Sequence, residues 1–426
     1  MGVISCGTTM LDAGEFQGLD VLSWDTTAKT ASFTGVAGNG YFVNTTSTAI
    51  TLTLPASPSA GDQVGVKDYA GTFGTNNLIV NRNGSNFGGG SDANTINYST
   101  SGSSLLFIYV DATQGWLVIQ DSSNTDTMAE KFITATGGSI TTSGDYKIHT
   151  FTGPGTFTVT CAGNAVGSNA VDYQVVAGGG GGASGSNNEG GGGGGAGGYR
   201  ETAGCGYTSS PLGTGVSQVP VSVQGYPITV GAGGAGAAGG PPNPAGACEG
   251  GNDGSNSVFS SIISAGGGGG GSADGASSSR SGGSGGGGGT YGKVGAAGNT
   301  PPVSPPQGNP GGNGGGGPPS FSGGGGGGAS AAGAAGTPSS SGNGGAGATT
   351  NISASPVTKG GGGGGGSDNA PGGTGGPGGG GNGGSSTAGS AGSANTGGGG
   401  GSGGGPNTNR GGDGGSGIVI IRYKFQ

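Results

Sequence analysis

Residues 178–417 of this chain are dominated by glycine, which accounts for 121 of the 426 residues in the whole sequence. Glycine makes up about 7% of an average protein, and it loses more backbone freedom on folding than any other residue. Within 296–417 the large apolar side chains are only Val303, Phe321, Ile352 and Val357. A conventional hydrophobic core therefore cannot form here, and a folded state must be held together by backbone hydrogen bonds.

Three kinds of structure are open to such a stretch. A collagen triple helix needs glycine at every third position, and no such register persists in the sequence. A flexible linker is the second alternative, since Gly/Ser tracts behave as random coils. The third is a bundle of polyglycine II helices, which have three residues per turn and no internal hydrogen bonds. Their N–H and C=O groups point sideways and must bond to neighbouring helices.

Two patterns favour the helix bundle. In a threefold helix every third residue lies on one face, and this spacing is found in Ala232/Ala235/Ala238, Pro310/Asn313 and Thr374/Pro377. Clusters of Pro, Ser and Asn, which form turns, separate the uninterrupted glycine runs. The runs expected in the interior of the bundle are Gly178–Gly182, Gly190–Gly195, Gly266–Gly271, Gly323–Gly328 and Gly360–Gly366. We therefore predict an ordered bundle over 178–415 with loops at its two ends.

The remainder of the chain shows β patterns. Residues 20–123 contain short runs of alternating apolar and β-branched residues, such as GYFVNTTSTAITLTLP at 40–55. They predict an antiparallel β-sandwich or small barrel. We expect an N-terminal segment at 1–19 before this module and a linker at 124–131 after it.

A second β stretch covers 132–177, and a single apolar strand, SGIVIIRYKFQ, occupies 416–426. Because a lone strand is unstable, we expect this strand to pair with those of 132–177. The predicted fold class is therefore all-β modules plus a polyglycine II helix bundle, which is inserted between strands of the second β module.

Charge and hydropathy exclude several classes of protein. The net charge of −8 offers no basic patch, so we expect no nucleic-acid partner. No apolar run reaches 18 residues, and the N-terminus lacks the pattern of a signal peptide, so we expect no membrane insertion. The four cysteines, Cys6, Cys161, Cys205 and Cys248, form no C-x-x-C motif. Pairing of Cys205 with Cys248 and free thiols are both open.

Catalytic signals are weak. His149 is the only histidine, and its place in the alternating segment DYKIHTFT predicts a residue of the sheet. Acidic residues are sparse and scattered, so neither a catalytic triad nor a carboxylate pair can be assembled. The segment GGTYGKV resembles a phosphate-binding loop, but Val294 stands where Ser or Thr would bind magnesium. We expect no enzymatic activity, no cofactor and no metal.

The amino-acid sequences of three segments resemble those of a known family. Residues 40–84, GYFVNTTSTAITLTLPASPSAGDQVGVKDYAGTFGTNNLIVNRNG, resemble a β module in virion structural proteins of tailed phages, especially marine cyanophages. The glycine-rich domain of the same proteins resembles FITATGGSITTSGDYKIHTFTGPGTFTVT at 132–160 together with SGIVIIRYKF at 416–425. More distantly, 178–415 is similar to the distal adhesins of long tail fibres in T-even-like phages, where a polyglycine II bundle presents variable loops to the host receptor.

This resemblance implies a phage fibre or tail adhesin on the exposed surface of the virion, assembled as a homotrimer. Its N-terminal part would attach to other virion proteins, and the bundle loops would contact a host cell-surface glycan or outer-membrane protein. Aromatic and arginine side chains near the ends of glycine runs are the candidate receptor-binding residues. They are Tyr199, Arg200, Arg280, Tyr291 and Phe321. The alternative for the rings is packing against the bundle or the β modules.

Three other functions are weighed against the adhesin. One is a purely structural decoration of the head, neck or tail. Another is an ice-binding protein, because small antifreeze proteins also use polyglycine II bundles, although they need a flat face with Thr or Ala at constant spacing. The third is an enzyme such as a depolymerase, for which the sequence offers no acid pair.

Overall fold

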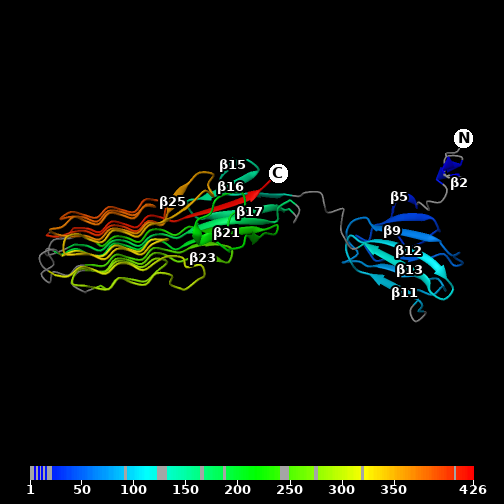
Figure 1. Cartoon of the computed structure of the whole chain (residues 1–426), viewed down its shortest axis with the longest axis horizontal. Helices are drawn as coiled ribbons and strands as arrows, with labels where there is room; N and C mark the ends of the chain where they lie inside the picture. Colours follow the sequence, from blue (N-terminus) through cyan, green and yellow to red (C-terminus); the bar gives the residue numbers. More distant parts are fainter. Residues whose placement is uncertain are drawn as a thin grey trace. The chain divides into compact units, whose positions relative to one another are not determined.

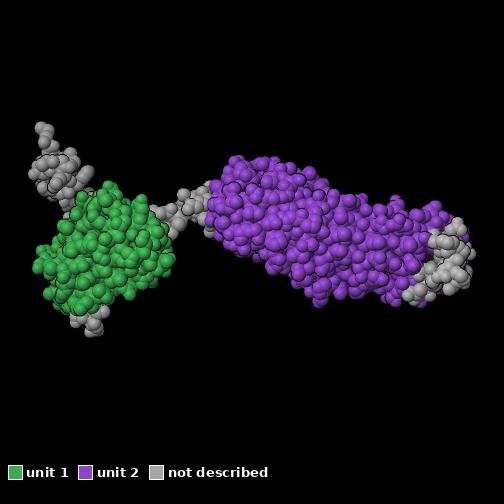
Figure 2. Space-filling model, turned by 180° about the vertical axis from the view of Figure 1, so that it is seen from behind, with its two compact units in different colours: residues 1–129 green, residues 130–426 purple. Residues whose placement is uncertain are grey.

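The computed structural model describes residues 22–90, 94–121, 132–163, 167–185, 189–239, 249–272, 277–317, 321–406 and 409–426, and four two-residue strands between residues 4 and 16. The chain divides into two compact units, Met1–Ala129 and Glu130–Gln426, which we describe separately (Figures 1 and 2). Most of the expected N-terminal segment 1–19, the expected linker 124–131 and Cys248 lie outside the described residues. The described part contains no helix long and apolar enough to span a membrane.

The first unit is a two-layer β-sandwich. Its short N-terminal strands are β1 (Ile4–Ser5), β2 (Thr8–Thr9), β3 (Leu11–Asp12) and β4 (Glu15–Phe16). The strands of the sandwich are β5 (Ser23–Lys29), β6 (Phe33–Thr34), β7 (Asn39–Val43), β8 (Ile50–Thr53), β9 (Gln63–Asp68), β10 (Leu78–Asn81), β11 (Thr95–Tyr98), β12 (Ser104–Asp111) and β13 (Gly115–Asp121). One sheet has the order β13-β12-β9-β7-β5 and the other β11-β10-β8-β6. Apolar residues from both sheets, including Leu52, Val66, Leu78 and Phe107, pack between the layers.

The expectation of an antiparallel sandwich is wrong in one respect. β5/β7, β7/β9, β6/β8 and β8/β10 are parallel pairs. The physical reason lies in the connections, because successive strands from β5 to β10 alternate between the two sheets. A chain that crosses to the other sheet and returns arrives beside its earlier strand in the same direction. The alternation of apolar residues that predicted the strands does not record which sheet each one joins.

The second unit begins with two further sheets. Their strands are β14 (Ile133–Thr136), β15 (Ser139–Ser143), β16 (Tyr146–Phe151), β17 (Gly155–Ala162), β18 (Ala170–Val176), β19 (Tyr199–Glu201), β20 (Val219–Pro220), β21 (Gly225–Thr229), β22 (Ser257–Phe259), β23 (Ile262–Ser264) and β26 (Ile418–Lys424). The sheets have the orders β14-β17-β21-β22-β23 and β15-β16-β26-β18-β19, with β20 beside β18. A hairpin of β24 (Ala348–Thr350) and β25 (Val357–Lys359) and one short 3-10 turn at Pro211–Gly213 complete the regular elements of the described part. The described residues contain no α-helix, so the all-β expectation is confirmed.

The C-terminal strand pairs where the sequence predicted. β26 lies between β16 and β18 and is antiparallel to both. Val419, Ile421 and Tyr423 enter the core between the two sheets, whereas Ile418 and Ile420 enter a second cluster on the opposite face. Both faces of β26 are therefore covered, which explains why its sequence is continuously apolar.

The glycine-rich stretch leaves the sheets as side-by-side extended segments that run back and forth (Figure 1). In the run Gly360–Gly366, each backbone N–H donates to a distant segment, and the receiving segment changes with a period of three. Three receiving segments alternate along the run. Gly194 and Gly191 accept from Gly363 and Gly366, respectively. Gly378 and Gly381 accept from Gly361 and Gly364, and Gly345 and Gly342 accept from Gly362 and Gly365, with all six N···O distances between 2.9 and 3.1 Å. These bonds satisfy backbone groups that no water could reach, because the whole run is buried.

Burial follows the same period. Ala232, Ala235 and Ala238 are exposed, whereas the intervening Gly231, Gly234 and Ala237 are buried. The other two predicted outward pairs, Pro310/Asn313 and Thr374/Pro377, are also exposed, and all five uninterrupted glycine runs are buried. The spacing of non-glycine residues thus predicted correctly which positions face solvent.

Candidate functional site

Tyr199, one of the five candidate binding residues, is a core residue. It lies in β19 opposite Val176 of β18, and only 1% of its surface is exposed. Its hydroxyl donates to Glu201 Oε2 at 2.9 Å and accepts from Gln174 Nε2 at 2.8 Å. The expectation that Tyr199 contacts a receptor is therefore wrong, because the glycine run before it passes directly into a strand of the sheet.

Glu201, beside it, organises a buried polar cluster where the bundle meets the sheets. Besides Tyr199, the hydroxyl of Ser210 (2.7 Å), the N–H of Ser210 (3.1 Å) and the hydroxyl of Thr350 donate to its carboxylate. Burial raises the pKa of Glu201, and these donors oppose that shift. Burial also lowers the pKa of nearby Lys359, which is 4% exposed. The cluster joins β19, β24 and the loop after β19, so we interpret it as structural.

Arg200 follows Tyr199 in β19 and is half-buried. It lies opposite Val175 of β18, in the sheet that anchors the glycine runs. Its position therefore separates it from the loops at the other end of the bundle.

Tyr291 and Phe321, in contrast, are brought together at the end of the bundle remote from the sheets. The N–H of Thr290 donates to Gly190 O, and the run from Gly190 reaches the sheet only at Tyr199. Since extended chain advances about 3 Å per residue, this end lies roughly 25–30 Å from the sheets. We call it the distal end.

The two rings form an edge-to-face pair, with centroids 5.6 Å apart and planes at 67°. Tyr291 is 51% exposed and Phe321 is half-buried beneath it. The Tyr291 hydroxyl donates to Glu189 Oε1 at 2.9 Å, and this hydrogen bond raises the pKa of the tyrosine. Tyr291 has a φ of +58°, in the left-handed region that non-glycine residues rarely adopt. Three segments of the chain thus cooperate to display one aromatic ring.

A polar groove lies beside this turn. It has a volume of about 350 Å³, and its lining includes Ser272, Ser277, Ser278, Ser279, Ser281, Lys293 and Val294. Lys293 and Val294 follow Tyr291 closely in the chain, and Val294 is 72% exposed. Arg280, between two groove serines, is exposed and lies 3.7 Å from Asp253 as an ion pair. We refer to the Tyr291–Phe321 pair, this groove and Arg280 together as the distal surface.

Proximity to a glycine run does not distinguish Tyr199 from Tyr291, because both residues stand next to such runs. The groove serines were missed as well, since Ser is abundant in every connection. A signal was available for Tyr291, however, because it lies in the turn Thr290–Tyr291–Gly292 between two runs, whereas Tyr199 precedes an Arg-Glu-Thr sequence that continues as a strand.

The remaining titratable candidates have structural surroundings. His149 is fully buried in β16, where Nδ1 lies 2.7 Å from Gly137 O and Nε2 lies 3.1 Å from the Tyr423 hydroxyl. Burial lowers its pKa. Cys161 and Cys205 carry free, exposed thiols. Among the described residues, no group of three or more His, Cys, Asp or Glu side chains is placed to hold a metal ion.

These features define an all-β protein in which a glycine-run bundle grows out of a β module and ends in a turn that displays an aromatic side chain. The family model of the glycine-rich domain matches residues 150–424, which is more than half of the chain. The chain therefore belongs to the glycine-rich domain family. No curated protein sequence matches it.

Proposed function

We propose that the glycine runs form a polyglycine II helix bundle. The support is the period of three in both hydrogen-bond partners and burial, which is the number of residues per turn of this helix. Each helix would bond to several neighbours at once. Such a bundle is stiff without a hydrophobic core, so it suits the display of a surface at a distance from an anchoring module.

We further propose that the protein is a virion fibre or tail adhesin of a tailed phage. In this proposal the first unit attaches to other virion proteins, and the distal surface contacts a host cell-surface glycan or outer-membrane protein. The observation that carries the proposal is the half-exposed Tyr291 ring, held by Phe321 and Glu189 beside a serine-lined groove. Sugars stack on aromatic faces and bond to hydroxyl groups, so this combination suits a glycan.

The proposal assigns no catalysis. The distal surface holds an aromatic pair, serines and one Arg–Asp ion pair, and a paired acid and base is missing from the described residues around it. Binding without chemistry is what such a surface supports.

Binding of the fluorescently labelled full chain to host cells tests the proposal. The double variant Tyr291→Ala/Phe321→Ala should lose about 5- to 150-fold in affinity, since an aromatic hot spot contributes about 1–3 kcal/mol. Tyr69→Ala is the matched control, because Tyr69 is 59% exposed but lies in the first unit. Equal binding by the wild type and the double variant would refute the assignment of the distal surface. Absence of antibody labelling for this protein on purified virions in immuno-electron microscopy would refute the proposed location on the virion.

A further inference from the structure

The outer face of the five-stranded sheet in the first unit is apolar. Its exposed or half-buried side chains include Leu106, Ile108, Leu117 and Ile119 from β12 and β13. Trp24 on β5 is 43% exposed, and Ile119 is 61% exposed. The inner face of the same sheet already packs in the sandwich core. A sheet that is apolar on both faces is typical of one covered on both sides.

The other sheet of the same sandwich provides an internal comparison. Its outward positions are mostly polar, with Thr51 and Thr53 on β8, Asn81 on β10 and Asn97 on β11, and Ile79 on β10 is an apolar exception. This is the usual pattern of a sheet with one solvated face. The apolar outer face is therefore a property of the five-stranded sheet alone and is not a general feature of the unit.

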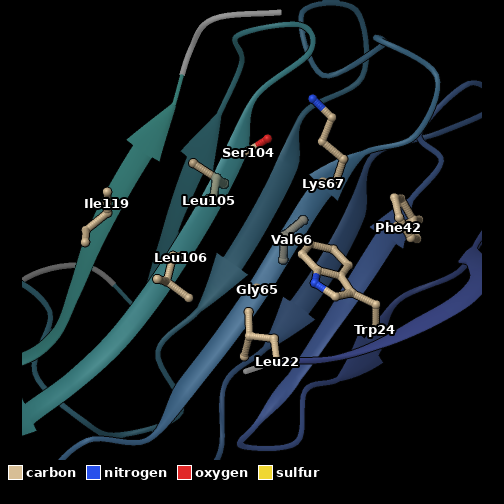
Figure 3. Close-up of a pocket in the computed structure, with 10 residues that line it drawn as sticks. All are labelled: Leu22, Trp24, Phe42, Gly65, Val66, Lys67, Ser104, Leu105, Leu106 and Ile119. Atoms are coloured by element: carbon tan, nitrogen blue, oxygen red, sulfur yellow. The ribbon is translucent and has the colours of Figure 1, made fainter. Parts of the chain in front are cut away.

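The apolar face is uneven, because a hollow separates one ridge of large side chains, Leu106 and Ile119, from a second ridge that includes Trp24 and Phe42. One row of paired residues crosses all five strands in the order Trp24, Gly40, Gly65, Leu106 and Ile119. A depression of about 480 Å³ lies at Gly65 in this row, and its lining also includes Leu22, Phe42, Lys67 and Ser104 (Figure 3). Figure 3 shows Leu106 and Ile119 on one side of Gly65, and Trp24 and Phe42 on the other.

Gly40 and Gly65 are both required for Trp24 and Leu22 to lie against the sheet. A Cβ on Gly40 would lie 2.5 Å from the Trp24 ring, and a Cβ on Gly65 would lie 2.5 Å from Leu22 Cδ1. Trp24 also packs on Phe42, with ring centroids 5.1 Å apart. Leu22 and Trp24 are therefore seated against the sheet as a fixed ridge, and the hollow between them and Leu106 is preformed.

We propose that a second copy of this chain covers this face. A two-fold axis through the face would place the Leu106/Ile119 ridge of each copy in the hollow of the other, so one patch supplies both ridge and hollow. Lys67, the charged residue of the hollow, already donates to Gly102 O at 2.9 Å, and it is 8% exposed. Association would thus bury an apolar surface whose cation is already hydrogen-bonded within the chain.

The dimensions of the face agree with a weak but specific dimer. Five strands about 4.8 Å apart and about seven residues long cover roughly 550 Å² in projection. The low end of specific interfaces is about 600 Å² per partner, and a corrugated face exposes more area than its projection. A self-complementary face closes with two copies, whereas the resemblance to phage fibres implies three. The inference is independent of the proposed function.

Trp24 offers a direct measurement. The chain has two tryptophans, and Trp116 is fully buried in the core, so a change in emission reports on Trp24. On dilution of the full-length protein across the micromolar range, we expect the emission to shift to longer wavelength as the dimer dissociates. Sedimentation velocity on the same samples should show twice the mass of one chain at the concentrated end.

Ile119→Lys places a charge on one ridge and should weaken the dimer at least tenfold. Because the Ile119 side chain is mostly exposed, the variant should fold, and unchanged emission of Trp116 in a Trp24→Phe background checks this. Val223→Lys, at an equally exposed position of the second unit (66%), is the matched control and should leave the dimer intact. A wild-type monomer throughout the range, a trimeric mass, or equal association of the Ile119→Lys and Val223→Lys variants would each overturn the proposal.

Discussion

Substitution of Gly363 by alanine should break the hydrogen-bond network of the glycine bundle. The Gly363 N–H donates to Gly194 O at 2.9 Å, and its carbonyl accepts from Gly326 N at 2.8 Å. A Cβ at this position would lie 2.0 Å from Gly400 O. Ordinary contacts to carbon begin near about 3.4 Å, so the segment around Gly400 would have to move by more than about 1 Å.

That movement has a calculable effect on stability. Gly400 itself donates to Gly180 O at 2.9 Å and accepts from Gly194 N at 2.8 Å. Displacing it therefore strains two bonds besides those of Gly363. Each buried group left without a partner costs about 1–3 kcal/mol. Alanine also stabilises by about 0.4–1 kcal/mol through the unfolded chain. We expect a net loss of roughly 2–5 kcal/mol in the free energy of unfolding of the second unit.

Gly316→Ala is the matched control. Gly316 lies in the same stretch with a φ outside the left-handed region, and a Cβ there meets nothing within 4 Å. It should change stability by less than about 1 kcal/mol. Calorimetry is the appropriate assay, because both tryptophans lie in the first unit and fluorescence would not report on the bundle. Equal stability of the two variants would refute the argument that the runs exclude every side chain.

Two further predictions concern the β module of the second unit. Deletion of residues 416–426 removes β26 from between β16 and β18. The calorimetric transition of the second unit should therefore disappear, while the tryptophan emission of the first unit stays unchanged. Two unaltered calorimetric transitions would contradict this prediction. Burial raises the pKa of Glu201 above its usual 4.5, so the folded unit binds this proton more tightly than the unfolded chain, and stability falls as pH rises from about 4.5 through the folded-state pKa. Between about pH 4 and pH 7, the free energy of unfolding of Glu201→Gln should therefore rise relative to that of the wild type. A difference in unfolding free energy that does not change with pH would count against the assignment.

The sequence was most informative where one physical rule acts alone. Most buried positions of the extended segments have no room for a Cβ, so uninterrupted glycine runs mark buried chain. Non-glycine residues spaced three apart, such as Ala232 and Ala235, mark positions that face solvent. The continuous apolar character of 418–421 likewise records a strand covered on both faces. These features were predictable because each residue type follows from local crowding.

Predictions failed where the outcome depends on a distant partner. The parallel pairs of the first unit follow from the alternation of strands between two sheets, and a strand's own sequence does not show which sheet it joins. Tyr199 became a core residue because β19 pairs with β18, and the neighbouring glycines carry no trace of that pairing. The pairing of Tyr291 with Phe321 across 30 residues was likewise invisible, although both residues were proposed separately.

The geometry of the bundle also indicates where such a protein can change its binding partner. A side chain at most glycine positions of the interior would collide with a neighbouring backbone, as at Gly363, and a side chain at the sheet end enters a packed core, as Tyr199 does. At the distal turn, Tyr291 contacts Phe321 and Glu189 and leaves the hydrogen bonds of the interior runs untouched. Substitution at the distal turns is therefore compatible with an unchanged bundle, since loops tolerate variation that packed elements do not. Under the proposed function, changes in receptor specificity should accumulate at these turns while the glycine runs stay the same.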